Sequence, residues 1–298
     1  MTGATGFIGR HLVADLVARG VDVVAVGRPL DRASLANAFT GVDAVVHLAG
    51  LVSAVREQDF STVNVELTRA VAEAARACGV RLIHVSSLAA AGPAPASVPR
   101  SEDDPPAPVT AYGRSKLEGE RVVAATRGLR WTILRPAIVY GPGDRAMLPL
   151  FRLASWGVLP LVGRPGAAYT VIHVADLIRA LVAALESGVD RETIFAGHPR
   201  PASAREILEA VRAAAGGAAR ILTVPMALAR IAALAGDIGG AIAGRPLPIN
   251  GSRYTELSAE GFVCRVDRLR DYLGIVAEVE LRDGLARTAA WYREQGWL

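Results

Sequence analysis

A glycine-rich turn at the start of the chain constrains the fold most. Gly3, Gly6 and Gly9 recur every third residue and lead into an amphipathic stretch that ends near Arg19. Glycine lets the backbone approach a pyrophosphate closely, and a helix N-terminus offers free N–H groups and the positive end of its dipole. Because the apolar run 21–26 follows, the pattern predicts the first turn of a dinucleotide-binding βαβ unit. The alternative is a glycine-rich loop without a ligand.

Apolar segments alternate with helical patterns along the first half of the chain. Strands that are buried on both faces of a parallel sheet appear as continuous apolar runs. The candidate strands are 21–26, 44–48, 82–85 and 131–134. Helical patterns lie between them at 33–39, 59–77 and 112–125. This alternation predicts an α/β fold, namely a Rossmann-type doubly wound parallel sheet.

The first strand of that sheet is apparently truncated. Only Met1 and Thr2 precede Gly3, where a buried strand of about five or six apolar residues is expected. Without it, the centre of the sheet would leave backbone N–H and C=O groups unpaired, which is rare in buried backbone. We therefore expect the natural product to begin upstream of Met1. We also expect the form that begins at Met1 to bind its cofactor weakly and to unfold easily.

Lys116 is the only lysine among 33 lysine and arginine residues, and it lies four residues after Tyr112. Arginine is a permanently charged planar fork, whereas lysine is a compact ammonium whose pKa responds to its surroundings. On a helix the two side chains lie one turn apart and point the same way. A neighbouring ammonium lowers the pKa of a phenol towards working pH, which suits Tyr112 for proton transfer. The alternative is an exposed helix pair with no chemical role.

These motifs together resemble the short-chain dehydrogenase/reductase superfamily, specifically its extended branch. That branch includes NAD-dependent epimerases and dehydratases, dihydroflavonol reductases and 3β-hydroxysteroid dehydrogenases. Further matching motifs are His47-Leu48-Ala49-Gly50, Asn64-Val65-Glu66, Val85-Ser86-Ser87, Leu134-Arg135-Pro136 and Tyr140-Gly141-Pro142-Gly143-Asp144-Arg145. The resemblance runs motif by motif through residues 1–180 and is only general beyond them. The ordered set is specific, although no single member is.

The resemblance implies a catalytic set of Ser87, Tyr112 and Lys116. The Ser87 hydroxyl would hydrogen-bond the substrate oxygen, Tyr112 would move the proton, and Lys116 would also hold the nicotinamide ribose. Ser86 is the alternative serine, but the second serine of the pair aligns with the catalytic one of the family. The implied cofactor-binding residues are Gly3, Thr5, Gly6, Phe7, Ile8, Gly9, Arg28, Leu48, Ala49, Gly50, Asn64, Tyr112, Lys116 and Pro136. His47 and His173 match structural positions of the family and receive no catalytic role.

Arg28 sets the expected cofactor preference. An acidic residue at the end of the second strand would hydrogen-bond the ribose 2′-hydroxyl, but Gly27-Arg28 stands there. A guanidinium pairs well with a 2′-phosphate. We therefore expect NADP(H) to be favoured over NAD(H), with a plain surface charge as the alternative role of Arg28.

Composition narrows the class of protein. Two cysteines, Cys78 and Cys264, in 298 residues indicate reduced thiols and a cytoplasmic location. The sequence has no Cys/His spacing typical of a metal site. Its net charge of +4 is spread along the chain, without the basic block that marks nucleic-acid binding. We expect a protein without metal or nucleic acid, either a monomer or a homodimer, that acts on a small molecule.

The chain is expected to divide into two regions. Residues 1–165 would form the dinucleotide-binding domain, with 169–197 partly returning to it, and 198–298 a smaller substrate-binding region. Within the latter, the apolar segment 221–243 is interrupted by Pro225, Arg230 and Asp237, and is therefore too broken to span a membrane. We expect it to pack in the core. The alternatives are a substrate wall, a dimer surface, or an interfacial helix in peripheral contact with a membrane.

The expected function is that of an NAD(P)-dependent oxidoreductase interconverting a secondary alcohol and a ketone on a hydrophobic small molecule. Many sugar-nucleotide members of the family carry Val-Tyr-Gly after the catalytic serine, whereas this chain has Ala90-Ala91-Gly92. A sugar-nucleotide epimerase, dehydratase or reductase is the enzymatic alternative. An alternative of another class is a non-catalytic dinucleotide sensor or assembly factor, against which the retained Tyr112 and Lys116 argue.

Overall fold

A parallel sheet forms the centre of the first lobe in the computed structural model, which describes residues 1–27, 31–164 and 166–298. Its strands are β1 (Ala44–His47), β2 (Arg81–Val85), β3 (Trp131–Pro136) and β8 (Glu192–Ala196). They lie in the order β1-β2-β3-β8, and every neighbouring pair is parallel. The predicted strands 44–48, 82–85 and 131–134 are confirmed to within two residues at each end.

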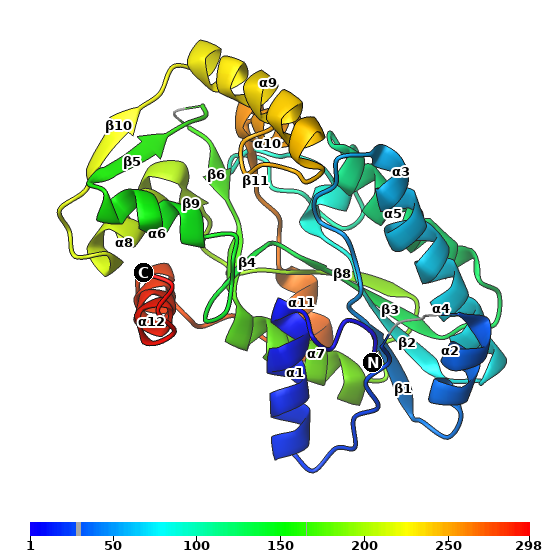
Figure 1. Cartoon of the computed structure of the whole chain (residues 1–298). Coiled ribbons are helices and arrows are strands. Elements are labelled where there is room, and N and C mark those ends of the chain that lie inside the picture. Colours follow the sequence, from blue (N-terminus) through cyan, green and yellow to red (C-terminus); the bar gives the residue numbers. More distant parts are fainter. Residues whose placement is uncertain (28–30, 165) are drawn as a thin grey trace.

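Helices cover both faces of this sheet (Figure 1). One face carries α1 (Phe7–Ala18), α7 (Val174–Glu186) and α11 (Asp267–Leu273), and the other carries α2 (Arg32–Phe39), α4 (Leu67–Ala77) and α5 (Ala111–Ala125). Neighbouring strand residues point to opposite faces: Ile83 packs with α1 and α7, whereas Leu82 packs with α2 and α4. The predicted doubly wound α/β fold is therefore confirmed.

The segment 21–26 is a predicted strand that does not form. Within the described chain it makes a single bridge, from Val26 to Thr2. Val21 and Val24 are about half exposed. A strand needs a neighbour to receive its backbone hydrogen bonds, and only Met1 and Thr2 lie between this segment and β1. The prediction of a strand at 21–26 is therefore wrong.

The predicted helix 59–77 forms as a continuous stretch of three helical segments of two kinds. These are α3 (Glu57–Phe60), the π-helix η1 (Ser61–Glu66) and α4. A short 3₁₀-helix, η2 (Leu88–Ala90), follows β2. The wider turn of a π-helix is uncommon and often occurs at functional sites. The π-helix η1 contains Asn64, a predicted cofactor-binding residue.

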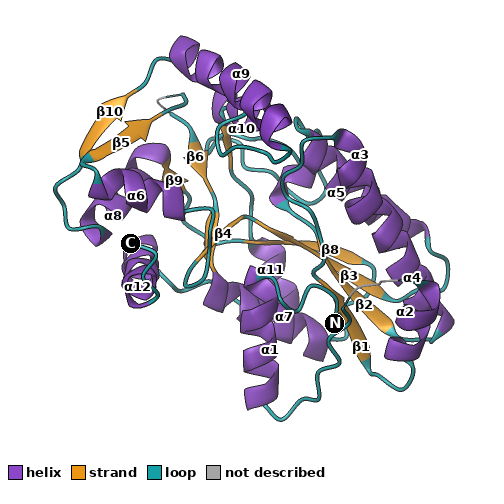
Figure 2. Cartoon of the chain, viewed as in Figure 1, coloured by secondary structure: helices purple, strands orange, loops and turns teal. Residues whose placement is uncertain are grey.

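The second lobe contains three small sheets and several helices (Figure 2). The strand pairs are β4 (Ile138–Tyr140) with β7 (Val171–His173), and β5 (Val158–Leu161) with β10 (Arg220–Thr223). A third sheet joins β6 (Ala168–Tyr169), β9 (Ala202–Ser203) and β11 (Gly261–Phe262). The helices are α6 (Leu148–Ser155), α8 (Ala204–Ala214), α9 (Met226–Ala243), α10 (Gly251–Ser258) and α12 (Leu281–Glu294). Their shared core includes Phe151, Leu285 and Tyr292, which are fully buried. The division into 1–165 and 198–298 stays a prediction.

The helix α9 differs from what its sequence predicts. It is one continuous helix, because Pro225 stands at its N-cap and its charged residues lie within it without breaking it. Among the described residues it is the one helix long and apolar enough to cross a membrane by length and composition, yet only 17% of it is buried. The expectation that 221–243 packs in the core is therefore wrong.

Candidate active site

The glycine turn before α1 is packed too closely for side chains. A Cβ on Gly3, whose φ is +74°, would lie 2.6 Å from the backbone N of Ala49. A Cβ on Gly9 would lie 2.1 Å from the carbonyl O of Gly3. Only glycine allows α1, the turn and the loop after β1 to approach in this way. The predicted residues Gly3, Gly9 and Ala49 therefore lie together.

The start of α1 is suited to an anion. Gly6 is the N-cap and has no side chain to occupy the first N–H groups, and the first turn contains no acidic residue. Thr5, Phe7 and Ile8 surround this end of the helix, and Arg10 Nη1 donates to the Thr5 carbonyl O at 2.8 Å. Free amides and the positive end of the helix dipole fit the pyrophosphate of a dinucleotide.

A chain of hydrogen bonds joins this turn to the next helix. Thr2 Oγ1 lies 2.6 Å from His47 Nδ1, and His47 Nε2 lies 3.0 Å from Thr68 Oγ1. Thr68 Oγ1 in turn donates to the Asn64 carbonyl O at 2.9 Å. Burial lowers the pKa of His47 to about 3, so the ring is neutral at pH 7. This placement agrees with the structural role expected for His47.

Asn64 fixes the loop that follows β1. Its Nδ2 donates to the Leu51 carbonyl O and to Ser115 Oγ, both at 2.9 Å, and its Oδ1 accepts from the Leu51 N–H at 2.8 Å. A Cβ on Gly50 would lie 3.8 Å from Lys116 Nζ, so this loop borders the α5 residues. Leu48, Ala49, Gly50 and Asn64, each predicted to bind the cofactor, therefore form one wall.

Ser87 and Tyr112 are in contact. The Ser87 hydroxyl acts on the phenol and opposes the rise that burial causes in the pKa of Tyr112; Ser87 is the N-cap of η2, two residues after β2, and Tyr112 stands in the first turn of α5. Gly113 permits this contact, because a Cβ there would lie 2.4 Å from the carbonyl O of Ala89. The Ser86 hydroxyl is buried and has no hydrogen-bond partner among the described residues. The geometry thus selects Ser87 rather than Ser86 as the serine beside the tyrosine.

Lys116 is buried one turn after Tyr112. Its Nζ donates to the Val85 carbonyl O at 2.7 Å. Burial lowers the pKa of Lys116 to about 8, against the opposing attraction of Glu120. The predicted lowering of the Tyr112 pKa is not found: burial raises it, the Ser87 hydrogen bond opposes that rise, and Glu256 adds to it. Desolvation of the phenolate is therefore the main cause of the shift, and Lys116 is not among its causes.

A buried ion pair supports Lys116 and was missed by the sequence analysis. Arg135 Nε and Nη2 donate to the two carboxylate oxygens of Glu120 at 2.9 and 2.6 Å, and both side chains are less than a tenth exposed. Glu120 stands four residues after Lys116, a spacing that places it on the same helix face. That spacing could have indicated Glu120 as a partner of Lys116 from the sequence. Pro136 follows Arg135 at the end of β3 and is buried.

Glu256 on α10 was also missed. Its charge adds to the rise of the pKa values of both Tyr112 and Tyr169. No sequence pattern linked position 256 to position 112, because only the fold of the second lobe brings them together. Arg28, the basis of the predicted NADP(H) preference, lies outside the described residues.

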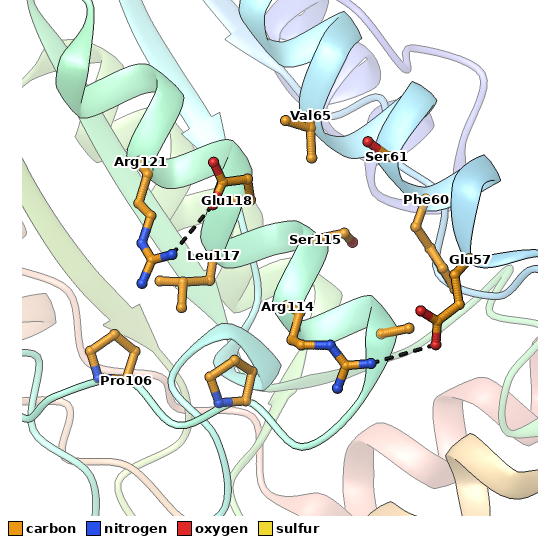
Figure 3. Close-up of a pocket in the computed structure, with 12 residues that line it drawn as sticks. Glu57, Phe60, Ser61, Val65, Pro106, Arg114, Ser115, Leu117, Glu118 and Arg121 are labelled. Atoms are coloured by element: carbon orange, nitrogen blue, oxygen red, sulfur yellow. Dashed lines mark hydrogen bonds and ion pairs between the residues drawn. The ribbon is translucent and has the colours of Figure 1, made fainter.

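A cavity of about 580 Å³ lies between α5 and the helical stretch of α3 and η1 (Figure 3). Phe60 and Val65 line it from α3 and η1, and Arg114 and Leu117 from α5. Arg114 bridges to Glu57 across its mouth at 3.5 Å. The cavity is therefore distinct from the site of Ser87, Tyr112 and Lys116. Across the described residues, no group of three or more His, Cys, Asp or Glu is placed to hold a metal.

The fold and the glycine turn define a dinucleotide-binding α/β protein. The NAD dependent epimerase/dehydratase family matches residues 1–197, and the chain belongs to that family. It is thus an NAD-dependent enzyme of the extended short-chain dehydrogenase/reductase type.

Its relatives differ in chemistry. The chain is 31% identical to the ceramide reductase of Caulobacter vibrioides, with 100% of this chain and 95% of that protein covered. It is 31% identical to sterol demethylase protein B of Methylococcus capsulatus, with 100% and 99% covered. Among solved structures, MoeE5 in complex with UDP-glucuronic acid and NAD is similar, with 28% identity, a TM-score of 0.77, and 99% and 98% of the chains covered.

The burial of Lys116 predicts a pH-dependent stability difference. Below pH 8 the ammonium is charged in both the folded and unfolded states, so its burial cost is fully present. Between pH 8 and pH 10.5 only the folded state loses the proton, so the wild-type protein gains stability relative to a Lys116→Met variant. The difference in unfolding free energy between the wild-type protein and the Lys116→Met variant should change by on the order of 3 kcal/mol over this range.

Thermal or urea unfolding of both proteins from pH 7 to pH 11 measures this shift. The control is Arg114→Met, which removes an exposed cationic side chain from the same helix. A Lys116→Met difference that stays constant with pH would contradict the lowered pKa.

Proposed function

We propose that the protein interconverts a secondary alcohol and a ketone on a hydrophobic small molecule, with NAD(P) as the redox partner. The observation that carries this proposal is the contact between the Ser87 hydroxyl and the Tyr112 phenol beside the buried ammonium of Lys116. These three groups suit proton transfer at one substrate oxygen. They lie next to the wall formed by the loop after β1, where a dinucleotide fits.

Tyr112 is the residue that transfers the proton in this site. Because burial raises its pKa, the phenol is protonated at pH 7 and is ready to give its proton to a carbonyl oxygen. The Ser87 hydroxyl donates a hydrogen bond to the same oxygen, and the positive charge of Lys116 stabilises the phenolate that forms. In the direction of alcohol oxidation these roles reverse. When bound, the nicotinamide supplies or accepts the hydride.

The cofactor would be held by residues of five segments. Gly3, Thr5, Gly6, Phe7, Ile8 and Gly9 would surround its pyrophosphate at the start of α1. Leu48, Ala49, Gly50 and Asn64 would line its groove, and Pro136 would flank the nicotinamide. Lys116 would bind the adjoining ribose. The fit rests on the uncapped start of α1 and on the close glycine packing around it.

A hydrophobic substrate is supported by the segment that follows Ser87. Ala90 and Ala91 are buried and carry no polar group, where many sugar-nucleotide enzymes of the family have a tyrosine. The ceramide reductase and the sterol demethylase protein act, by name, on lipids, and both match the full length of this chain. The second candidate is a sugar-nucleotide epimerase or reductase, which is favoured by the likeness to MoeE5 with its bound UDP-glucuronic acid.

We also propose that the enzyme prefers NADP(H) to NAD(H). Support comes from Gly27-Arg28, because no acidic residue stands there to bind a ribose 2′-hydroxyl. A non-catalytic sensor on the same fold is disfavoured, since Ser87, Tyr112 and Lys116 are all present and converge.

Removal of the Tyr112 hydroxyl tests the catalytic set. A Tyr112→Phe variant should lose roughly 100- to 10,000-fold in kcat, the usual contribution of a general acid or base. Binding of the reduced cofactor, followed by its fluorescence, should change little, and this binding serves as the control for folding. Lys116→Arg should be nearly as damaging, because a planar fork does not reproduce the ammonium. Undiminished turnover in either variant would exclude the assigned roles.

A substrate screen separates the proposed functions. The protein is incubated with NADP⁺ and hydrophobic secondary alcohols, including long-chain and sterol alcohols, and in parallel with UDP- and dTDP-sugars. An oxidoreductase should form NADPH in equal amount to the ketone. An epimerase would convert the sugar nucleotide without net reduction of cofactor, and that outcome would replace the proposal. Cofactor binding without turnover would favour a sensor.

Arg28→Ala tests the cofactor preference. If Arg28 pairs with the 2′-phosphate, the variant should lose about 1.5–3 kcal/mol of NADP(H) binding free energy and little of NAD(H) binding, as for a charge-assisted hydrogen bond. Titration by cofactor fluorescence measures both affinities. Equal losses for the two cofactors would mean that Arg28 serves the fold, and tight NAD(H) binding by the unmutated protein alone would reverse the preference.

A further inference from the structure

One side of α9 is a continuous apolar surface exposed to solvent. Its large side chains are Leu228, Ile231, Leu234, Ile238 and Ile242, whose exposed fractions run from 56% to 83%. At 3.6 residues per turn, these five positions fall within an arc of about 120° on the helix. We call them the outer face of α9. Contiguous apolar patches of this kind commonly mark a site of interaction.

The inner face of α9 is made of small residues. Ala233, Gly236 and Gly240 are its buried positions, and they lie opposite the outer face. A Cβ on Gly236 would lie 1.8 Å from the carbonyl O of Ile249, so the helix rests directly on the backbone that leads to α10. An ordinary surface helix turns its large apolar side chains inward. In α9 this order is reversed, and the close inner packing holds the large side chains outward.

The surroundings of the outer face are positively charged. Residues 220–250 contain the arginines Arg220, Arg230 and Arg245 and a single acidic residue, Asp237. Both carboxylate oxygens of Asp237 accept from the Gly251 N–H, at 3.1 and 3.2 Å. Arg230 and Arg245 are exposed. An apolar stripe flanked by exposed arginines complements a lipid surface with anionic headgroups.

We propose that the outer face of α9 docks the protein on a membrane that contains anionic lipid, with the helix lying in the plane of the interface. The helix does not cross the bilayer in this arrangement, because its inner face is packed on protein and it carries Arg230 and Asp237. A second copy of the chain suits the surface less well. A symmetric pair would bring the arginines of the two copies together, whereas anionic headgroups neutralise them.

The position of α9 connects this surface with the active site. Helix α9 packs against α10, and Glu256 of α10 influences the pKa of Tyr112. Figure 1 shows α9 and α10 lying across the top of the molecule between the two lobes. Docking therefore places the bilayer next to the elements that border the catalytic groups. This suits the hydrophobic substrate proposed above, but vesicle binding requires neither substrate nor turnover, so the two proposals can fail separately.

Vesicle flotation of the full chain tests the docking surface. The protein is mixed with vesicles of phosphatidylcholine alone or of phosphatidylcholine with phosphatidylglycerol, and the bound fraction is measured. We expect binding to the phosphatidylglycerol vesicles that weakens as salt rises. Ile238→Glu should lower the partition coefficient at least about tenfold, because a charge replaces an isoleucine that would insert into the bilayer. Arg230→Gln should lower it about fivefold on anionic vesicles.

The matched control is Val17→Glu at the end of α1. Val17 is 59% exposed, close to the 65% of Ile238, and lies on another helix at the opposite side of the molecule in Figure 1. Its variant should bind vesicles like the wild-type protein. Ile242→Glu, at the 83% exposed end of α9, gives a second test with less risk to folding, which thermal melting checks.

Several outcomes would overturn the proposal. One is no binding of the wild-type protein to either vesicle, and another is equal binding by the wild-type, Ile238→Glu and Ile242→Glu proteins. A third is a dimer, seen by gel filtration, that Ile238→Glu dissociates while vesicles bind neither form. In that case a second copy of the chain covers the outer face of α9.

Discussion

The backbone of Thr2 joins the two segments on which the dinucleotide site is built. Its N–H donates to the Val46 carbonyl O at 3.1 Å, and its own carbonyl accepts from the Leu48 N–H at 3.2 Å. On the other side, the Val26 N–H donates to the Met1 carbonyl O at 2.8 Å. These hydrogen bonds fix the position of the glycine turn relative to β1. Every contact of that turn, including the packing of Gly3 on Ala49, depends on them.

The Thr2 hydroxyl begins a chain of hydrogen bonds that leads towards α5, the helix of Tyr112 and Lys116. Through His47 and Thr68 it reaches Asn64, which holds the loop after β1 and binds Ser115 on α5. Because every member of this chain is buried and neutral, its hydrogen bonds form in a low-dielectric setting, where they are strong and specific. The cofactor wall and the helix that carries Tyr112 are therefore positioned by one network.

Two opposing effects act on the pKa of Lys116 in α5. Burial of Lys116 favours loss of its proton, while Glu120 favours the charged form. The carboxylate of Glu120 is in turn paired with Arg135. The charge of Lys116 is therefore buried together with two other charged groups and not alone. A buried charge without partners would be far more costly. The arrangement keeps an ammonium with a pKa near working pH beside a phenol that stays protonated, which suits a site that gives and takes one proton.

The sequence by itself determined the α/β class, the strands β1, β2 and β3 and the helices that carry the site, because periodicity and turn chemistry are local properties. It also predicted Ser87, Tyr112 and Lys116 as the catalytic set, through motifs whose order along the chain resembles that of the family, and this role stays a proposal. Tertiary structure alone decided three matters. The run 21–26 formed no strand beyond the single bridge from Val26 to Thr2, because a strand needs a neighbour, and burial raised the pKa of Tyr112. The apolar helix α9 turned its large side chains to solvent, because its glycine face fits the backbone beneath it more closely than those side chains allow.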